Sequence, residues 1–193
     1  MKKIVYKFFV SSSLLFGFVS CILKPDFPSE PVISYSSLNK KSILDADGQI
    51  IEDSIFVEVN FQDGNGDVGL SSADTTGNFA IRKDDGTLNP YYYNYYCTIY
   101  RRNKFTGEYE RFKLPTYIDP VTGKTEELNI HGRVPPLLEN DQGPIEGKLL
   151  YKIGGLDPSI FNSKDSIRFE IFIYDRSLNQ SNVITTPSII INE

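Results

Sequence analysis

The sequence lacks several residue types that enzymes and stapled folds depend on. It has no tryptophan, one histidine (His131), two cysteines and a single methionine at its start. One histidine excludes a metal site built on two histidines, and no Ser/His/Asp grouping is apparent, so His131 is read as a solvated or hydrogen-bonded strand residue. Cys21 and Cys97 cannot form a disulfide framework. No glycine-rich phosphate loop precedes a helix, so nucleotide chemistry is not expected.

The first 20 residues have the pattern of a bacterial export signal. A lysine-rich start precedes an apolar stretch at 8–19, which is shorter than the ~20 residues needed to span a bilayer. We predict a lipoprotein signal peptide at 1–20 and lipidation of Cys21. Phe18 and Val19 replace the usual Leu and small residue of such signals. The alternatives are an ordinary signal peptide cleaved nearby and an uncleaved anchor.

The remainder of the chain, after the signal, reads as one acidic domain on a short tether. Residues 21–31 are rich in proline and read as the lipidated cysteine and its tether. Residues 32–193 have the length of a single domain. Removing residues 1–20 takes away three lysines and leaves a net charge of −8. This charge argues against nucleic acid as a partner and against electrostatic adhesion to anionic lipid headgroups.

Composition and residue alternation predict an all-β fold. Tyr, Phe, Ile, Val and Thr are abundant, and Ser54–Gln62 and Ser166–Tyr174 alternate apolar and polar residues with period two. A series of strands without helices between them favours an antiparallel β-sandwich. The further predicted strands are Pro31–Ser36, Phe79–Lys83, Tyr91–Arg102, Tyr109–Tyr117, Leu128–Val134, Gly147–Ile153 and Val183–Ile191.

The tyrosine-rich run Tyr91–Tyr96 allows two interpretations. Strand alternation puts Tyr92, Tyr96 and Tyr100 on one face and the odd-numbered tyrosines with Cys97 on the other. The first three could form a stacking surface for a sugar or a peptide, because tyrosine is a low-entropy contact residue. The alternative, which we favour from the sequence, is that these tyrosines fill the core and cover the sheet. Cys97 is predicted to be a buried, inert thiol.

An acidic, glycine-rich loop follows the strand at Ser54–Gln62. Asp63, Asn65 and Asp67 alternate with glycines, so a turning loop can direct three oxygen-bearing side chains at a hard cation such as Ca²⁺. Asp74 stands where an EF-hand loop carries its last ligand. The loop follows a strand and lacks the central glycine, so a calcium loop at a strand end is expected rather than an EF-hand. The alternative is an acidic turn held by Asx hydrogen bonds.

A second loop supplies a further ligand. The segment beginning at Asp175 resembles the Asp-x-x-x-Asn-x-Ser turn before the last strand of many bacterial immunoglobulin-like and fibronectin-III-like domains. In such sandwiches the end of an early strand lies at the same pole as this turn. We therefore predict a structural Ca²⁺ site formed by Asp63, Asn65, Asp67, Asp74 and Asp175, completed by carbonyl groups and water.

Taken together, the sequence resembles a group of Bacteroidetes-type lipoproteins. The resemblance is carried by the signal, the proline-containing tether, and the segments Val59–Leu70 (VNFQDGNGDVGL) and Ile167–Asn182 (IRFEIFIYDRSLNQSN). It implies an immunoglobulin-like sandwich of unassigned activity at the outer membrane. Surface-exposed members often carry acids directly after the cysteine, whereas 22–24 contain none. The periplasmic face is therefore expected rather than the cell surface.

The sequence favours a binding protein over an enzyme. We predict a non-catalytic binding or assembly module that meets an unidentified envelope protein or a glycan. The alternative is a polysaccharide-acting glycoside hydrolase or a carbohydrate-binding accessory, because that hydrolysis needs only two carboxyl groups ~5–10 Å apart. A cleft with two close carboxylates would favour the hydrolase, and a flat tyrosine face would favour the binder. Available carboxylates are Glu108, Glu110, Glu126, Glu127 and Glu139.

Overall fold

A computed structural model describes residues 25–138, 143–156 and 158–193. The predicted signal peptide and Cys21 lie outside these residues. Regular structure in the described part is β-strand, apart from the short 3₁₀ helix η1 at Gly77–Phe79, and the strands pair antiparallel. The prediction of an all-β fold with antiparallel sheets is confirmed. The described residues contain no helix long and apolar enough to span a membrane.

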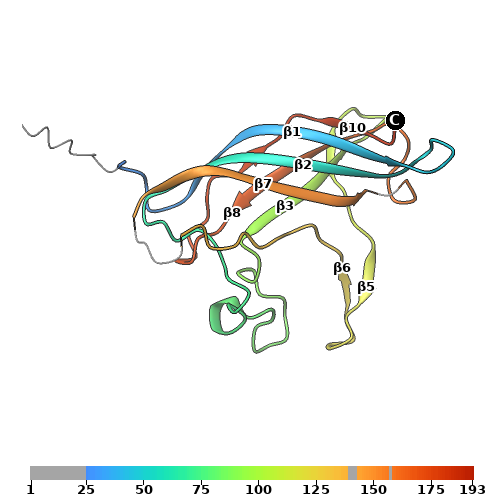
Figure 1. The fold of residues 1–193 in the computed structure, drawn as a ribbon. Coiled ribbons are helices and arrows are strands. Elements are labelled where there is room, and N and C mark those ends of the chain that lie inside the picture. Colours follow the sequence, from blue (N-terminus) through green and yellow to red (C-terminus); the bar gives the residue numbers. More distant parts are fainter. Residues whose placement is uncertain (1–24, 139–142, 157) are drawn as a thin grey trace, which may run out of the picture.

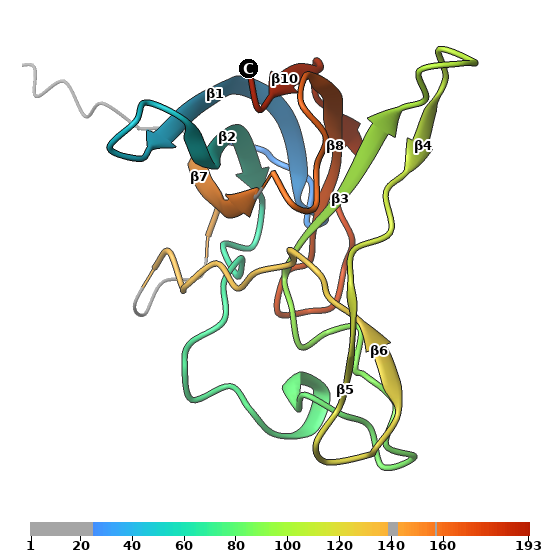
Figure 2. The same ribbon diagram turned by 90° about the vertical axis from the view of Figure 1, so that its right-hand side faces the viewer.

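The strands form two main sheets and a small separate one (Figure 1). The first sheet has the order β1-β2-β7, and the second has the order β10-β8-β3-β4, with β9 also paired to β8. A two-stranded sheet of β5 and β6 stands apart from them, as Figure 2 shows. The bounds are β1 Val32–Leu44, β2 Ile50–Asp63, β3 Tyr95–Arg102, β4 Tyr109–Arg111, β5 Thr116–Ile118, β6 Thr125–Glu127, β7 Ile145–Leu156, β8 Asp165–Ile173, β9 Ile184–Thr185 and β10 Ile189–Ile191.

One hydrophobic core lies between the two main sheets, in a sandwich-like arrangement. The predicted alternation of β2 and β8 is confirmed, since Val57 and Val59 of β2 and Phe169 and Ile171 of β8 are fully buried members of one cluster. Burying each such side chain stabilises the fold by roughly 1.5–3 kcal/mol. Cys97 of β3 is also buried there, and burial raises the pKa of its thiol, as expected for an inert cysteine.

The strands run between two ends of the sandwich, which we call the entry pole and the far pole. At the entry pole the chain enters β1, where Val32 pairs with Gln62 near the end of β2. At the far pole Ile191 pairs with Asp165, and the Asn192 N–H donates to Asp53 Oδ2 at 2.7 Å. The described chain therefore starts and finishes at opposite ends of the sandwich (Figure 1).

Several strand boundaries differ from the predictions. β1 runs to Leu44, well beyond the predicted Pro31–Ser36, and turns into β2 through a hydrogen-bonded loop at 45–49. The predicted strand Tyr109–Tyr117 is split into β4 and β5, because the Leu114 N–H donates to Glu127 instead of to a neighbouring strand. Likewise Val183–Ile191 is divided into β9 and β10, with Pro187 between them.

Two predicted strands are wrong, and a third begins late. Phe79–Lys83 contains the end of η1 and only one bridge, between Arg82 and Leu88. In Leu128–Val134 only Gly132 bridges to Tyr95, because the Asn94 amide bonds both the N–H and the C=O of Val134 in place of a strand ladder. The run from Tyr91 to Asn94 is a turn, so β3 begins at Tyr95.

Candidate functional site

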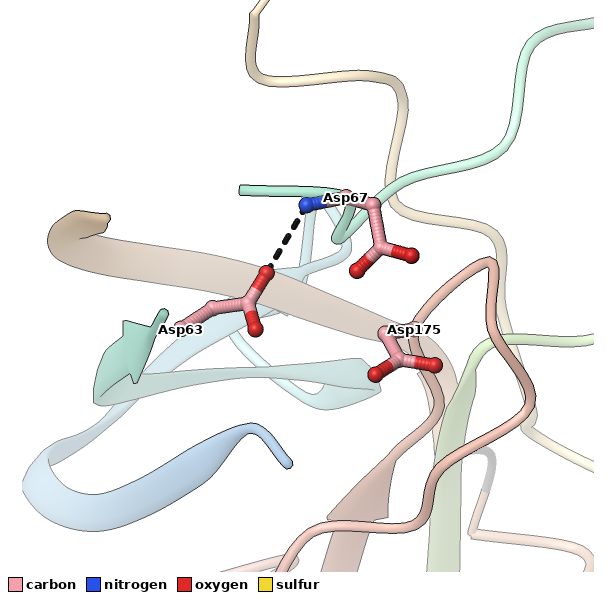
Figure 3. Close-up of side chains that lie close together, drawn as sticks. All are labelled: Asp63, Asp67 and Asp175. Carbon is pink, nitrogen blue, oxygen red and sulfur yellow. Dashed lines mark hydrogen bonds between the residues drawn. The ribbon is translucent and has the colours of Figure 1, made fainter. Parts of the chain in front are cut away.

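Three aspartates converge at the entry pole. Asp63 ends β2, Asp67 lies in the loop that follows, and Asp175 comes just after β8. One carboxylate oxygen from each lies within 4.8 Å of the other two (Figure 3). Asp63 and Asp175 are buried and Asp67 is half-buried. The structure thus brings together three of the predicted ligands from two loops far apart in sequence, and we call them the aspartate triad.

Neutral donors hold the triad in place. The Asp67 N–H donates to Asp63 Oδ2 at 2.8 Å (Figure 3). Ser177 donates to Asp67 Oδ2 through its N–H and its hydroxyl, at 3.0 and 2.7 Å. Asn179 donates to Asp175 through its N–H and its side-chain amide, at 2.7 and 2.8 Å. Each carboxylate is oriented without a positive charge.

No direct ion pair among the described residues neutralises the triad, although the Arg176 guanidinium, which is paired with Asp74, attracts the Asp67 carboxylate from beyond ion-pair distance. Within the described ranges no lysine or arginine forms an ion pair with any of the three. Burial, followed by repulsion from Asp67 and then from Asp175, raises the pKa of Asp63 to about 6. Burial also raises the pKa of Asp175. Buried carboxylates are normally paired or bound to metal, and a hard cation with oxygen ligands would relieve this repulsion.

Asn65 lies against the same carboxylates. With its amide nitrogen turned toward them, it donates to Asp63 Oδ1 at 2.8 Å and to Asp67 Oδ1 at 2.9 Å. With its oxygen turned toward them, the amide offers a cation a fourth oxygen ligand, because an asparagine side chain carries both a donor and an acceptor. The predicted role of Asn65 therefore fits its position.

Asp74, the remaining predicted ligand, is not brought to the triad. Its carboxylate receives hydrogen bonds from Arg176 at 2.6 and 3.0 Å and from the Ser71 N–H at 2.7 Å. These bonds, above all those from Arg176, hold the pKa of Asp74 well below its usual range. Arg133 donates to the backbone oxygens of Ser71 and Asp74 and lies over the Tyr92 ring at 4.9 Å. The Asp74 loop thus connects the triad to a second candidate site.

This second site, the tyrosine groove, is a hollow of about 450 Å³. Tyr92 and Tyr96, two of the three tyrosines considered for a stacking surface, line it, whereas Tyr100 does not and pairs with Arg111 and Arg168 in the strand register. Tyr93 also lines the groove, with its ring 4.9 Å from that of Tyr92. Strand alternation predicted Tyr93 on the face opposite to Tyr92 and Tyr96. This prediction is wrong, because Tyr93 precedes β3 and lies in a turn.

His131 also lines the groove, next to Tyr96. Its ring centroid is 4.3 Å from that of Tyr96, and its Nδ1 accepts a hydrogen bond from the Cys97 N–H at 3.2 Å. This ring nitrogen therefore takes the place of the backbone carbonyl that a neighbouring strand would offer to the Cys97 N–H. Burial lowers the pKa of His131 to about 4, so the imidazole is neutral near pH 7. No sequence signal pointed to this position.

Two of the carboxylates considered for hydrolysis, Glu126 and Glu127, line the groove as well. Arg82 binds Glu126 at 3.0 Å, and Arg111 binds both oxygens of Glu127 at 3.1 and 3.2 Å. Burial raises the pKa of Glu127, but the hydrogen bonds from Arg111 and the Leu114 N–H outweigh it, and the net shift is downward. Glu139 lies outside the described residues.

Comparisons with known proteins give no relative from which to transfer a role. No protein-family model matches the chain, and neither the curated proteins nor the solved structures gave a match.

Proposed function

We propose that this chain is a non-catalytic glycan-binding module of the bacterial cell envelope, with the tyrosine groove as its binding site. In this proposal the module is an immunoglobulin-like sandwich, as in the Bacteroidetes-type lipoproteins that the sequence resembles. Lipid on Cys21 anchors it to the periplasmic face of the outer membrane. The observation that carries the binding role is the cluster of tyrosine rings in one groove.

The lining of the groove suits a sugar chain. Tyr92 and Tyr93 are half-exposed, and no described residue forms a hydrogen bond with either hydroxyl. Exposed Leu88 and Leu128 add apolar surface at the rim. Sugar rings present apolar C–H faces, which pack on aromatic rings, and hydroxyl groups, which pair with polar tips. A groove of about 450 Å³ lies within the size range of small-molecule sites.

The charges in the groove support binding rather than hydrolysis. A glycosidase needs one carboxyl group with a raised pKa as the acid and a second, free carboxylate as nucleophile or base. Glu126 and Glu127 are each held by an arginine, and the pKa of Glu127 is lowered. His131 is neutral and is used as a hydrogen-bond acceptor for the backbone. The groove therefore offers contacts without a general acid.

Calcium completes the proposal as a structural ion. The aspartate triad and Asn65 supply oxygen ligands, and Arg176, which follows Asp175, binds Asp74. Arg133 donates a hydrogen bond to the backbone oxygen of Asp74 and lies over the Tyr92 ring, so it links the Asp74 loop to the tyrosine groove. An ion at the triad would fix both loops and so support one wall of the tyrosine groove. Sites of this kind in extracellular modules bind with Kd of ~10⁻⁴–10⁻³ M.

Affinity electrophoresis of residues 22–193 in gels containing neutral polysaccharides tests the groove. We expect retardation in at least one neutral glycan, weakened about tenfold or more by Tyr92→Ala with Tyr93→Ala, since each stacked ring is worth ~1 kcal/mol or more. Tyr35→Ala, which removes an exposed tyrosine from β1 on the other main sheet, is the control. No retardation by any glycan contradicts the proposal. Release of reducing sugar from a bound glycan would favour the hydrolase.

A further inference from the structure

A second hollow, of about 430 Å³, lies beneath the β3–β4 hairpin at the far pole. Its lining carries the densest group of cationic side chains in the described chain, opposed by two carboxylates, Glu110 and Asp165. We call it the basic hollow. Its cations are Arg101, Arg102, Lys104, Arg111 and Lys113.

The positive charge stands out against the rest of the molecule. Residues 101–113 contain five cations and two carboxylates, a net charge of +3, in a chain whose net charge is −5. Arg101 and Lys104 bind the buried Asp165, at 3.5 and 3.3 Å. Arg102 and Lys113 are exposed and form no ion pair with any described carboxylate. Their charge is available to a ligand.

The basic hollow and the tyrosine groove meet at Arg111, which lines both. Between them lies a small cavity of about 50 Å³, where residues of the 111–114 and 127–131 segments pack beside β3. Tyr96 and Arg102 lie on the same face of β3, six residues and about 20 Å apart. A single sugar ring cannot cover this length, whereas an oligosaccharide can.

We infer that the ligand is an acidic glycan, whose rings lie in the tyrosine groove and whose carboxylate or phosphate groups enter the basic hollow. This inference rests on the proposed function and specifies its ligand class. Arginine side chains bind such anions through two parallel hydrogen bonds, which adds both affinity and orientation. Lys113 adds a point charge at the rim of the hollow.

The apex of the hairpin fits the same ligand. Phe105 is 100% exposed, yet its turn is well held, because the N–H groups of Phe105 and Thr106 both donate to Asn103 Oδ1, at 2.9 and 3.2 Å. An exposed aromatic ring on a well-held turn, beside a cationic hollow, offers a sugar both stacking and charge. The hairpin lies at the pole opposite the one at which the proposed tether leads into β1, which favours an envelope polymer over lipid headgroups.

Two matched pairs of polymers test the inference in affinity electrophoresis of residues 22–193. Polygalacturonate is compared with its methyl ester, and phosphomannan with mannan, so that each pair differs in charge. The variant is Arg102→Gln with Lys113→Gln. Its control is Lys41→Gln with Lys152→Gln, which removes the same charge from exposed positions on the other sheet.

We expect tighter binding of an acidic polymer than of its neutral partner. The Arg102/Lys113 variant should lose about tenfold toward the acidic form, from one or more charge-assisted hydrogen bonds, and keep its affinity for the neutral form. The control should behave as wild type, and thermal melting checks that both variants fold.

Three other results overturn the inference. If neutral and acidic polymers bind alike, or the variant binds the acidic polymer as wild type does, the basic hollow has no role, while the neutral-glycan result leaves the proposed function standing. Binding of the protein to phosphatidylglycerol vesicles is measured as a second experiment. Vesicle binding that the variant loses, without binding of any acidic polymer, would assign the hollow to lipid headgroups instead.

Discussion

The two poles of the sandwich each bury aspartate side chains, and they balance the charge differently. At the far pole Asp165 is buried, and Arg101 and Lys104 reach it from the β3–β4 hairpin. At the entry pole Asp63 is equally buried, but its nearest charged neighbours are two further aspartates. At the far pole basic side chains of the chain pair with the buried carboxylate, whereas at the entry pole no described lysine or arginine forms an ion pair with the triad, and a bound cation is the proposed counterion.

The largest expected effect comes from the glycine that shapes the triad loop. Gly66 has φ +74°, and a Cβ there would overlap the backbone of Gly143. Gly48, in the β1–β2 turn at the far pole, has a similar φ of +79° but open space around it. We expect Gly66→Ala to lower the free energy of unfolding by about 3 kcal/mol, from backbone strain plus overpacking, and Gly48→Ala by about 1 kcal/mol. Urea denaturation measures both; equal losses would contradict the close packing of the triad loop.

Replacing one aspartate at each pole tests the comparison directly. In chelator, Asp165→Asn should lower the free energy of unfolding by about 2 kcal/mol, because it weakens charge-assisted hydrogen bonds. Asp63→Asn should leave stability unchanged or raise it, because it removes repulsion while its amide oxygen still accepts the Asp67 N–H. Thermal unfolding gives both values.

The two variants should also differ in how calcium changes their thermal stability. At ten times Kd, binding to the native state adds about 1.4 kcal/mol of stability. We expect millimolar calcium to raise the Tm of wild type and of Asp165→Asn. The Tm of Asp63→Asn should be the same in calcium as in chelator. A calcium response that survives Asp63→Asn would place the ion elsewhere.

The smallest expected effect is a pH dependence. The pKa of Asp63 is about 6 in the folded protein, above its usual value of 3.8, so the native state binds the proton more tightly. Its contribution to stability is therefore present at low pH and lost as pH rises through about 6. His131 acts in the opposite direction, because its pKa of about 4 lies below its usual value of 6.5.

The Asp63→Asn variant keeps His131 and isolates the Asp63 contribution. In chelator, lowering the pH from 7 to 5 should stabilise wild type by about 1 kcal/mol relative to this variant. Denaturation curves at both pH values measure the difference. An identical pH dependence of the two proteins would mean that Asp63 is not held in a repulsive environment.

The sequence allowed prediction of those parts of the fold and site that depend on local pattern. The alternation of Ser54–Gln62 predicted which side chains of β2 enter the core. The spacing of Asp63, Asn65 and Asp67 predicted one turning loop that gathers the three side chains, but hydrogen bonding turns the amide nitrogen of Asn65, rather than its oxygen, toward the two carboxylates. The placing of Asp175 at the same pole came from the resemblance of its turn to known sandwiches.

The choice among distant partners could not be predicted from the sequence. Asp74 has the spacing expected of a calcium ligand, but its carboxylate forms an ion pair with Arg176, about a hundred residues later. The segment Leu128–Val134 had the composition of a strand, yet the Asn94 side chain replaces its ladder. Tyr93 was misplaced because one turn residue before β3 breaks the alternation. For Asp74 and for Leu128–Val134 a contact distant in sequence decided the outcome, whereas for Tyr93 the cause was the local turn.

The opposite placement of the two poles has a mechanical consequence. Gly64 N donates to Pro28 O at 2.7 Å, so the segment leading into β1 is fastened to the triad loop. A pull between this segment and a ligand on the hairpin is directed along the strands, from one pole to the other. The hydrogen bonds between β1 and β2 then share the force simultaneously instead of opening one after another. The long pairing from Val32 to Leu44 makes this domain suited to withstand tension in shear.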